Sequence, residues 1–129
     1  MKSIEVLGLK KYYGNIKAVD GVDFYVEPGS LFAFLGPNGA GKSTVIDILC
    51  TLSRPQAGQA FINGMEIGRE DEKIRSEIGA VFQEGVLDRL LSVRENLMLR
   101  GSFYGLKGEE LKKRTENALL EADAAECAD

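Results

Sequence analysis

The hydrophobic pattern predicts strands in the first two-thirds of the chain. Strand-like segments, apolar or alternating, occur at residues 4–9, 22–26, 31–35, 60–62 and 78–82. The alternation of apolar and polar positions at 22–26 indicates a half-buried strand. Leu31–Leu35 is apolar throughout, which is typical of a strand buried on both faces. Asn63-Gly64 follows one of these segments and predicts a hairpin turn.

Helical spacing begins after the glycine-rich residues 36–41 and dominates the end of the chain. Helices are predicted at about residues 42–52, 70–77, 92–104 and 109–122. Arg54-Pro55 ends the first of them, and Ser92 with Glu95 fits a capping box at the start of the third. The order is therefore strands, a strand–loop–helix unit, further strands and then helices alone. This order predicts a separate helical region with its boundary near Leu91.

Composition excludes several classes of function. The 129 residues suit one domain, and 16 basic against 20 acidic residues argue against a protein that binds nucleic acid directly. No apolar run approaches the roughly 20 residues of a membrane span, and no apolar signal region follows Met1. The chain has no histidine, which removes histidine-based acid–base catalysis and metal binding. Cys50 and Cys127 are expected to be reduced thiols.

One glycine-rich segment carries chemistry. Residues 36–43 read GPNGAGKS and fit the pattern G-x-x-x-x-G-K-[ST] between an apolar run and a helix. Glycines allow successive backbone N–H groups to point at one anion, and the helix N-terminus adds donors and the positive end of its dipole. The alternative, an ordinary glycine-rich turn before a helix, does not require Lys and Ser in this register. The predicted phosphate-binding residues are Gly36, Pro37, Asn38, Gly39, Ala40, Gly41, Lys42, Ser43 and Thr44.

The side chains at the end of this segment have separate predicted roles. Lys42 places a cation on the β- and γ-phosphates of a nucleotide, and the Ser43 hydroxyl binds Mg²⁺. Thr44 adds a hydrogen bond to the α-phosphate. Lys42 is thereby predicted to be one of the catalytic residues.

The string GPNGAGKST resembles the phosphate loop of ATP-binding-cassette (ABC) ATPases, and the resemblance extends over nearly the whole chain. It implies an α/β P-loop NTPase core at residues 1–91, which includes an antiparallel β region. Residues 92–129 would form the start of the family's helical subdomain. Residues 11–14, KYYG, are similar to the family's aromatic loop. The resemblance implies that Tyr13 stacks on adenine, with Tyr12 as the alternative. The implied cofactors are ATP and Mg²⁺.

Val81-Phe82-Gln83 resembles the glutamine loop of the same family. The resemblance implies that the Gln83 amide reaches Mg²⁺ or the attacking water, which makes Gln83 a second catalytic and metal-binding candidate. Residues 91–97, LSVRENL, look like the family segment that follows this loop. In such proteins the loop and the next helices contact a transmembrane partner. The segments 83–88 and 101–106 are most similar to the branch that powers drug and polymer export.

Three family motifs are not found in these residues: the L-S-G-G-Q signature, the apolar run followed by Asp-Glu, and the switch histidine. The resemblance therefore implies an N-terminal half that binds MgATP without hydrolysing it alone. The parent function would be ATP hydrolysis coupled to transport at the cytoplasmic face of a membrane, with a transmembrane subunit and a second ATPase domain as partners. A non-transport ABC protein and a non-catalytic nucleotide-binding module remain alternatives. An open sheet edge at Leu31–Leu35 would favour self-association.

Overall fold

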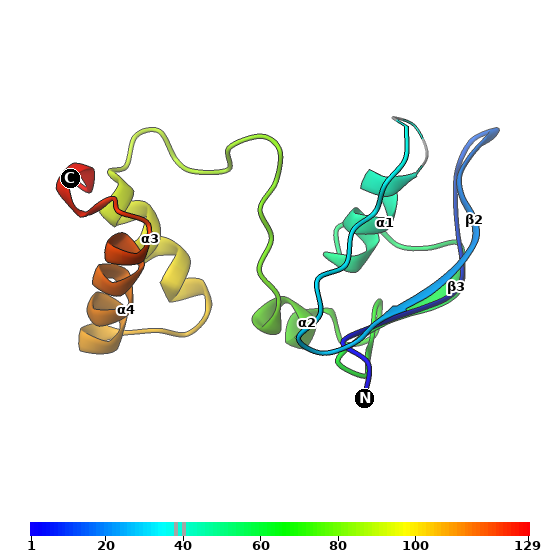
Figure 1. Cartoon of the computed structure of the whole chain (residues 1–129), viewed down its shortest axis with the longest axis horizontal. Helices are drawn as coiled ribbons and strands as arrows, with labels where there is room; N and C mark the ends of the chain where they lie inside the picture. The colour runs from blue at the N-terminus through cyan, green and yellow to red at the C-terminus, as the bar shows by residue number, and fades with distance from the viewer. Residues whose placement is uncertain (38, 40) are drawn as a thin grey trace. The chain divides into compact units, whose positions relative to one another are not determined.

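The computed structural model describes residues 1–37, 39 and 41–129, and these form two compact units, Met1–Ala80 and Val81–Asp129 (Figure 1). Asn38 and Ala40, two predicted phosphate-loop residues, lie outside the described residues. The functional division that we expect at residues 1–91 and 92–129 stays a prediction.

The first unit is built on a four-stranded antiparallel sheet of order β2-β1-β3-β4. Its strands are β1 (Ile4–Tyr13), β2 (Ile16–Val26), β3 (Ala57–Ile62) and β4 (Met65–Glu66). β1 and β2 are longer than their apolar patterns because they pair along their whole length, from Ile4 opposite Val26 to Tyr13 opposite Ile16. The hairpin predicted at Asn63-Gly64 joins β3 to β4.

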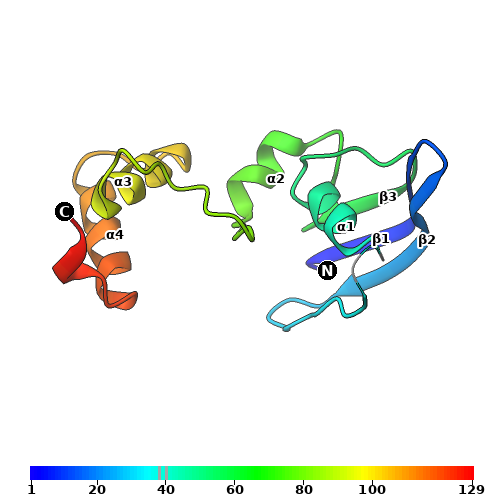
Figure 2. The ribbon, with the colours of Figure 1, turned by 90° about the horizontal axis from the view of Figure 1, so that it is seen from above.

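Two helices complete the first unit. α1 (Lys42–Leu49) packs against β2 and β3 (Figure 2). α2 (Asp71–Glu77) packs against β4. α1 ends before the predicted Leu52, because Thr51 adopts a left-handed backbone with φ of 63°. The two helices and the sheet share one hydrophobic core, whose buried side chains are Val6, Leu9, Val19, Val45, Ile48, Leu49, Ala60, Ile62, Ile67 and Ile74.

Two of the predicted strands are wrong. Leu31–Leu35 and Ile78–Phe82 have no regular secondary structure, and Leu31 and Leu35 are 101% and 92% exposed. A strand exists only through hydrogen bonds to a neighbouring strand, and within the described residues no strand lies beside either segment. Part of the run Leu31–Leu35 is still anchored, because the rings of Phe32 and Phe34 pack on Phe24.

The second unit is helical, as the pattern predicted. α3 (Val93–Phe103) and α4 (Gly108–Glu121) pack on each other, and a short 3-10 turn, Ala125–Cys127, follows. The predicted capping box is confirmed: Ser92 Oγ accepts a hydrogen bond from the Glu95 amide at 3.2 Å, and Glu95 Oε2 accepts one from the Ser92 amide at 2.7 Å. Among the described residues, no helix has the length and apolar character needed to span a membrane.

One testable consequence concerns Gly58, where β3 passes unusually close to β1. A Cβ atom at Gly58 would lie 2.3 Å from the Gly8 carbonyl oxygen, and Gly58 has φ of +82°. Gly14, at φ of +60°, has no atom within 4 Å of such a Cβ position. Gly14→Ala should lower the free energy of unfolding by about 1–2 kcal/mol, the cost of a left-handed backbone. Gly58→Ala must also displace β1, so its loss should exceed about 3 kcal/mol.

Urea unfolding followed by circular dichroism measures both losses. Equal losses for the two variants would show that the β1–β3 approach is not as tight as described.

Candidate functional site

The predicted phosphate loop and the predicted aromatic residue line one cavity. The cavity measures about 250 Å³ and is lined by Tyr13, Ile16, Ala18, Gly39, Gly41, Lys42, Ser43 and Thr44. These residues come from the tip of the β1–β2 hairpin and from the start of α1, which are separated by more than twenty residues of chain. The fold thus brings Tyr13 to the loop that precedes α1.

Gly41 fixes how the start of α1 sits on the sheet. Its backbone is left-handed, with φ of 83°, and a Cβ atom there would lie 2.0 Å from the carbonyl oxygen of Ala18 on β2. Any side chain at this position would therefore force the helix away from β2. The sequence motif requires glycine at this position, but it does not predict the contact with Ala18.

The N-terminus of α1 offers unpaired donors to an anion. The first hydrogen bond of the helix is donated by the Val45 amide to the Gly41 carbonyl at 3.0 Å, so the amides of residues 42–44 have no partner within the helix. In the described structure no side chain caps this end, and the first turn contains no acidic residue. Such a helix start favours a bound anion by both its N–H groups and its dipole.

The side chains of the loop fit a phosphate chain. Lys42 Nζ donates a hydrogen bond to the Gly36 carbonyl, so its ammonium lies over the loop itself. The Ser43 side chain is exposed at the cavity, where its hydroxyl can reach a cation held by phosphates. Gly36 and Pro37 precede these residues in exposed, irregular backbone. The donor set, with one ammonium, two hydroxyls and several amides, is suited to a triphosphate with Mg²⁺.

Tyr12 and Tyr13 have different surroundings. The Tyr12 hydroxyl donates a hydrogen bond to Asp20 Oδ1 at 2.5 Å, which raises the pKa of Tyr12 and lowers that of Asp20. Tyr13 is half exposed and lines the cavity, with the Lys11 ammonium 5.3 Å from its ring centre. The geometry thus leaves the Tyr13 ring, and not that of Tyr12, at the mouth of the loop.

Gln83 belongs to the second unit and is exposed. It lies in irregular backbone before α3 rather than at the end of a strand. Its contact with a metal or a water molecule stays a prediction.

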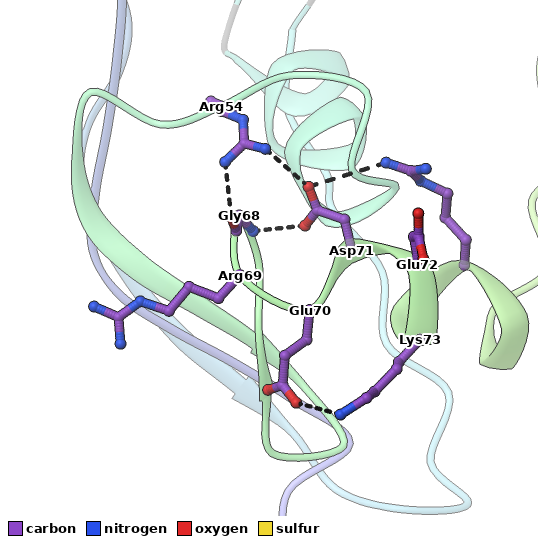
Figure 3. A pocket seen from close by; sticks show the side chains of 8 residues that line it. Arg54, Gly68, Arg69, Glu70, Asp71, Glu72 and Lys73 are labelled. Atoms are coloured by element: carbon purple, nitrogen blue, oxygen red, sulfur yellow. Dashed lines mark hydrogen bonds and ion pairs between the residues drawn. The ribbon is translucent and has the colours of Figure 1, made fainter.

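A larger cavity of about 460 Å³ lies elsewhere on the first unit, among charged side chains (Figure 3). Arg54 donates to the Gly68 carbonyl at 2.9 Å and to Asp71 Oδ2 at 3.3 Å, and Asp71 Oδ1 accepts from the Gly68 amide at 2.6 Å. Arg75 lies 4.0 Å from the same carboxylate and donates to Thr51 Oγ1 at 2.7 Å. These groups satisfy one another, so the network ties α2 to the end of α1.

The comparisons with known proteins agree with the fold and the loop. The family model described as "ABC transporter" matches residues 19–129. The chain therefore belongs to the ABC transporter family.

Curated relatives share much of this sequence. The daunorubicin resistance ATP-binding protein of Streptomyces coeruleorubidus is 40% identical over 96% of this chain. The linearmycin resistance ATP-binding protein of Bacillus subtilis is 40% identical over 90%, and the Nod factor export ATP-binding protein I of a Rhizobium species 38% identical over 86%. The chain spans only 39%, 37% and 36% of the length of these relatives.

Solved structures show the same P-loop ATPase fold. An ATP-binding subunit of an ABC transporter superposes with a TM-score of 0.85 at 31% identity, covering 97% of this chain and 52% of that structure. A dimeric bacterial ABC transporter cassette gives a TM-score of 0.83 at 29% identity, covering 98% of this chain and 60% of that structure. The expected α/β P-loop fold class is thereby confirmed.

The charged network of Figure 3 gives a second testable prediction. Asp71→Asn keeps the shape of the side chain but weakens its contacts with Arg54 and Gly68, so the free energy of unfolding should fall by about 1–2 kcal/mol. Glu72→Gln changes the same charge on the neighbouring exposed residue and should alter stability by less than about 0.5 kcal/mol. Urea denaturation of both variants provides the measurement. A loss for Glu72→Gln as large as that for Asp71→Asn would contradict a specific role for Asp71.

Proposed function

We propose that this chain is the nucleotide-binding part of an ABC transporter ATP-binding subunit and that it binds MgATP in the cavity before α1. The observation that carries the proposal is the shared cavity of Tyr13 with Gly39, Gly41, Lys42, Ser43 and Thr44. An aromatic ring at one side and a cation with unpaired amides at the other match the two ends of a nucleotide. The family membership supports the same conclusion.

Each residue has one role in this proposal. The amides at the start of α1 hold the phosphate oxygens, Lys42 neutralises the terminal phosphates, and Thr44 bonds the α-phosphate. Ser43 would hold Mg²⁺, which when bound neutralises charge on the β- and γ-phosphates. The role of Gln83 as a further Mg²⁺ ligand is proposed from the sequence resemblance alone. Tyr13 stacks on the base. Asn38 and Ala40 enter only as members of the sequence motif.

Hydrolysis by the 129-residue chain alone is not part of the proposal. Its sequence contains no L-S-G-G-Q signature, no apolar run followed by Asp-Glu and no histidine. In the family these motifs position the attacking water and complete the charge around the γ-phosphate. Phosphoryl transfer depends almost wholly on such positioning and electrostatic stabilisation, so the chain by itself should bind MgATP without hydrolysing it.

The names of the relatives support a role in export. Two of these relatives are named for resistance to daunorubicin or linearmycin, and a third is named for the export of Nod factor. We propose that the subunit works at the inner face of a membrane with a transmembrane subunit and a second ATPase domain. One solved relative, a bacterial ABC transporter cassette, is dimeric, which supports the second ATPase domain. For the chain alone, exposed Leu31 and Leu35 favour self-association.

The first test replaces the cation of the loop. Lys42→Ala removes the charge nearest to the terminal phosphates and should weaken MgATP binding about 10- to 100-fold, because hydrogen bonds to charged groups contribute about 1.5–3 kcal/mol. Lys113→Ala, which removes a charge from α4, should leave the affinity unchanged. Isothermal titration calorimetry measures both. If Lys42→Ala binds MgATP as tightly as the parent chain, the proposed phosphate site is wrong.

The second test separates the two tyrosines. Tyr13→Ala should weaken nucleotide binding by about 1–3 kcal/mol, the range found for base–aromatic stacking. Tyr12→Ala should leave binding nearly unchanged, because the Tyr12 hydroxyl is engaged by Asp20. Since stacking tolerates any base, GTP should lose affinity in parallel with ATP. Titration of the variants with both nucleotides checks this; a loss in Tyr12→Ala alone would move the base contact to Tyr12.

A further inference from the structure

Asn96 is a buried polar residue of α3, with only 5% of its surface exposed. Its side chain is fully engaged: Oδ1 accepts a hydrogen bond from the Asp88 amide at 2.9 Å. Nδ2 lies within hydrogen-bond distance of three carbonyl oxygens, those of Asp88 at 2.9 Å, Leu91 at 3.2 Å and Ser92 at 3.0 Å. One side chain thus binds both the N–H and the C=O of Asp88, as a neighbouring strand would.

The segment that Asn96 binds, residues 86–91, has no helix or strand of its own. Apolar burial contributes little to holding it, because Val86, Leu87 and Leu90 are 50%, 57% and 94% exposed and Leu91, at its end, is only partly buried. Further hydrogen bonds fix the segment: Arg100 donates to the Val86 carbonyl, and Asp88 Oδ1 accepts from the Leu90 amide at 2.8 Å. Hydrogen bonds therefore contribute more than apolar burial to its conformation.

The residues before this segment differ from it. Within the described part of the chain, residues 79–85, which include Gln83, form no hydrogen bond or ion pair. They are exposed and irregular. The held segment thus begins directly after the free backbone that carries Gln83.

We propose that Asn96 is a positioning residue, which fixes residues 86–91 to α3 and so confines any movement of Gln83 relative to α3 to the backbone of residues 83–85. The proposal rests on the proposed function only for the role of Gln83; the attachment itself is a property of the second unit. By this arrangement the segment 86–91 moves together with α3, while Gln83 remains adjustable.

The test compares amide hydrogen exchange, followed by NMR, in the whole 129-residue chain. Asn96→Ala removes all of these side-chain hydrogen bonds, so the Asp88 amide and the Leu91 carbonyl lose this partner, while the carbonyls of Asp88 and Ser92 still accept from the Leu91 and Asn96 amides. The amides of Asp88, Leu90 and Leu91 should exchange about 10- to 100-fold faster, as expected when the part-buried hydrogen bonds that hold the segment are lost. Asn96→Asp retains the acceptor for the Asp88 amide but places a carboxylate against carbonyl oxygens, and should accelerate the amides of Leu90 and Leu91.

Thr115→Val is the matched control for general loosening. Thr115 is equally buried, at 4% exposure, and its hydroxyl donates only within α4, to the Leu111 carbonyl at 2.8 Å. The Thr115→Val variant should accelerate amide exchange in α4 and leave the exchange rates of residues 86–91 unchanged. If Asn96→Ala accelerates α4 and residues 86–91 equally, or leaves residues 86–91 unchanged, the positioning role is overturned.

Nucleotide titration separates this proposal from the proposed function. Asn96→Ala should bind MgATP as tightly as the parent chain, because Asn96 does not line the phosphate-loop cavity and the substitution leaves the Gln83 side chain itself intact. A chain that does not bind MgATP contradicts the proposed function, while the exchange result still decides the role of Asn96. If Asn96→Ala does not fold, Arg100→Met, which removes the bond to Val86, should accelerate exchange at Asp88 and Leu90, whose amides are hydrogen-bonded; no acceleration would overturn the attachment.

Discussion

The close approach of Gly41 to the Ala18 carbonyl is the constraint on which the candidate site depends. Two backbones meet there with no room for a Cβ atom, and Gly41 also has a left-handed backbone. The contact presses the start of α1 onto β2. Since β2 pairs with β1 and places Ile16 opposite Tyr13, the same contact brings the helix start to the aromatic end of the hairpin. One glycine and one strand register therefore create the cavity.

Polar side chains hold two segments of the chain that have no strand neighbour. Asp71 binds the Gly68 amide and the Arg54 guanidinium, which ties the turn after β4 to the segment after α1. Asn96 does the same for residues 86–91 on α3. Both residues satisfy backbone groups that would otherwise be unpaired, and a lost partner of this kind costs more than an ordinary surface contact. The irregular segments are thus specified by few side chains, each with several bonds.

The apolar segments that lack a partner show the limit of the hydrophobic pattern. Leu31–Leu35 is apolar enough for a buried strand, yet Leu31 and Leu35 are exposed because no strand in the described chain pairs with this segment. The solved relatives with the same fold extend well beyond the part that this chain covers, 52% and 60% of their length. Strand character here is a property of the pairing and not of the segment itself.

The sequence by itself determined the features that depend on neighbours within a few residues. These are the capping box at Ser92, the turn at Asn63-Gly64, the approximate helices and the phosphate-loop motif. Each depends on hydrogen bonds or backbone preferences between residues that are close together in the sequence. Only the tertiary structure decided the full length of the β1–β2 hairpin, the approach of Tyr13 to the start of α1, and the attachment made by Asn96. Each of these depends on the register or packing of segments that no local pattern aligns, because the contacts join residues that are apart in the sequence and form only when each unit packs.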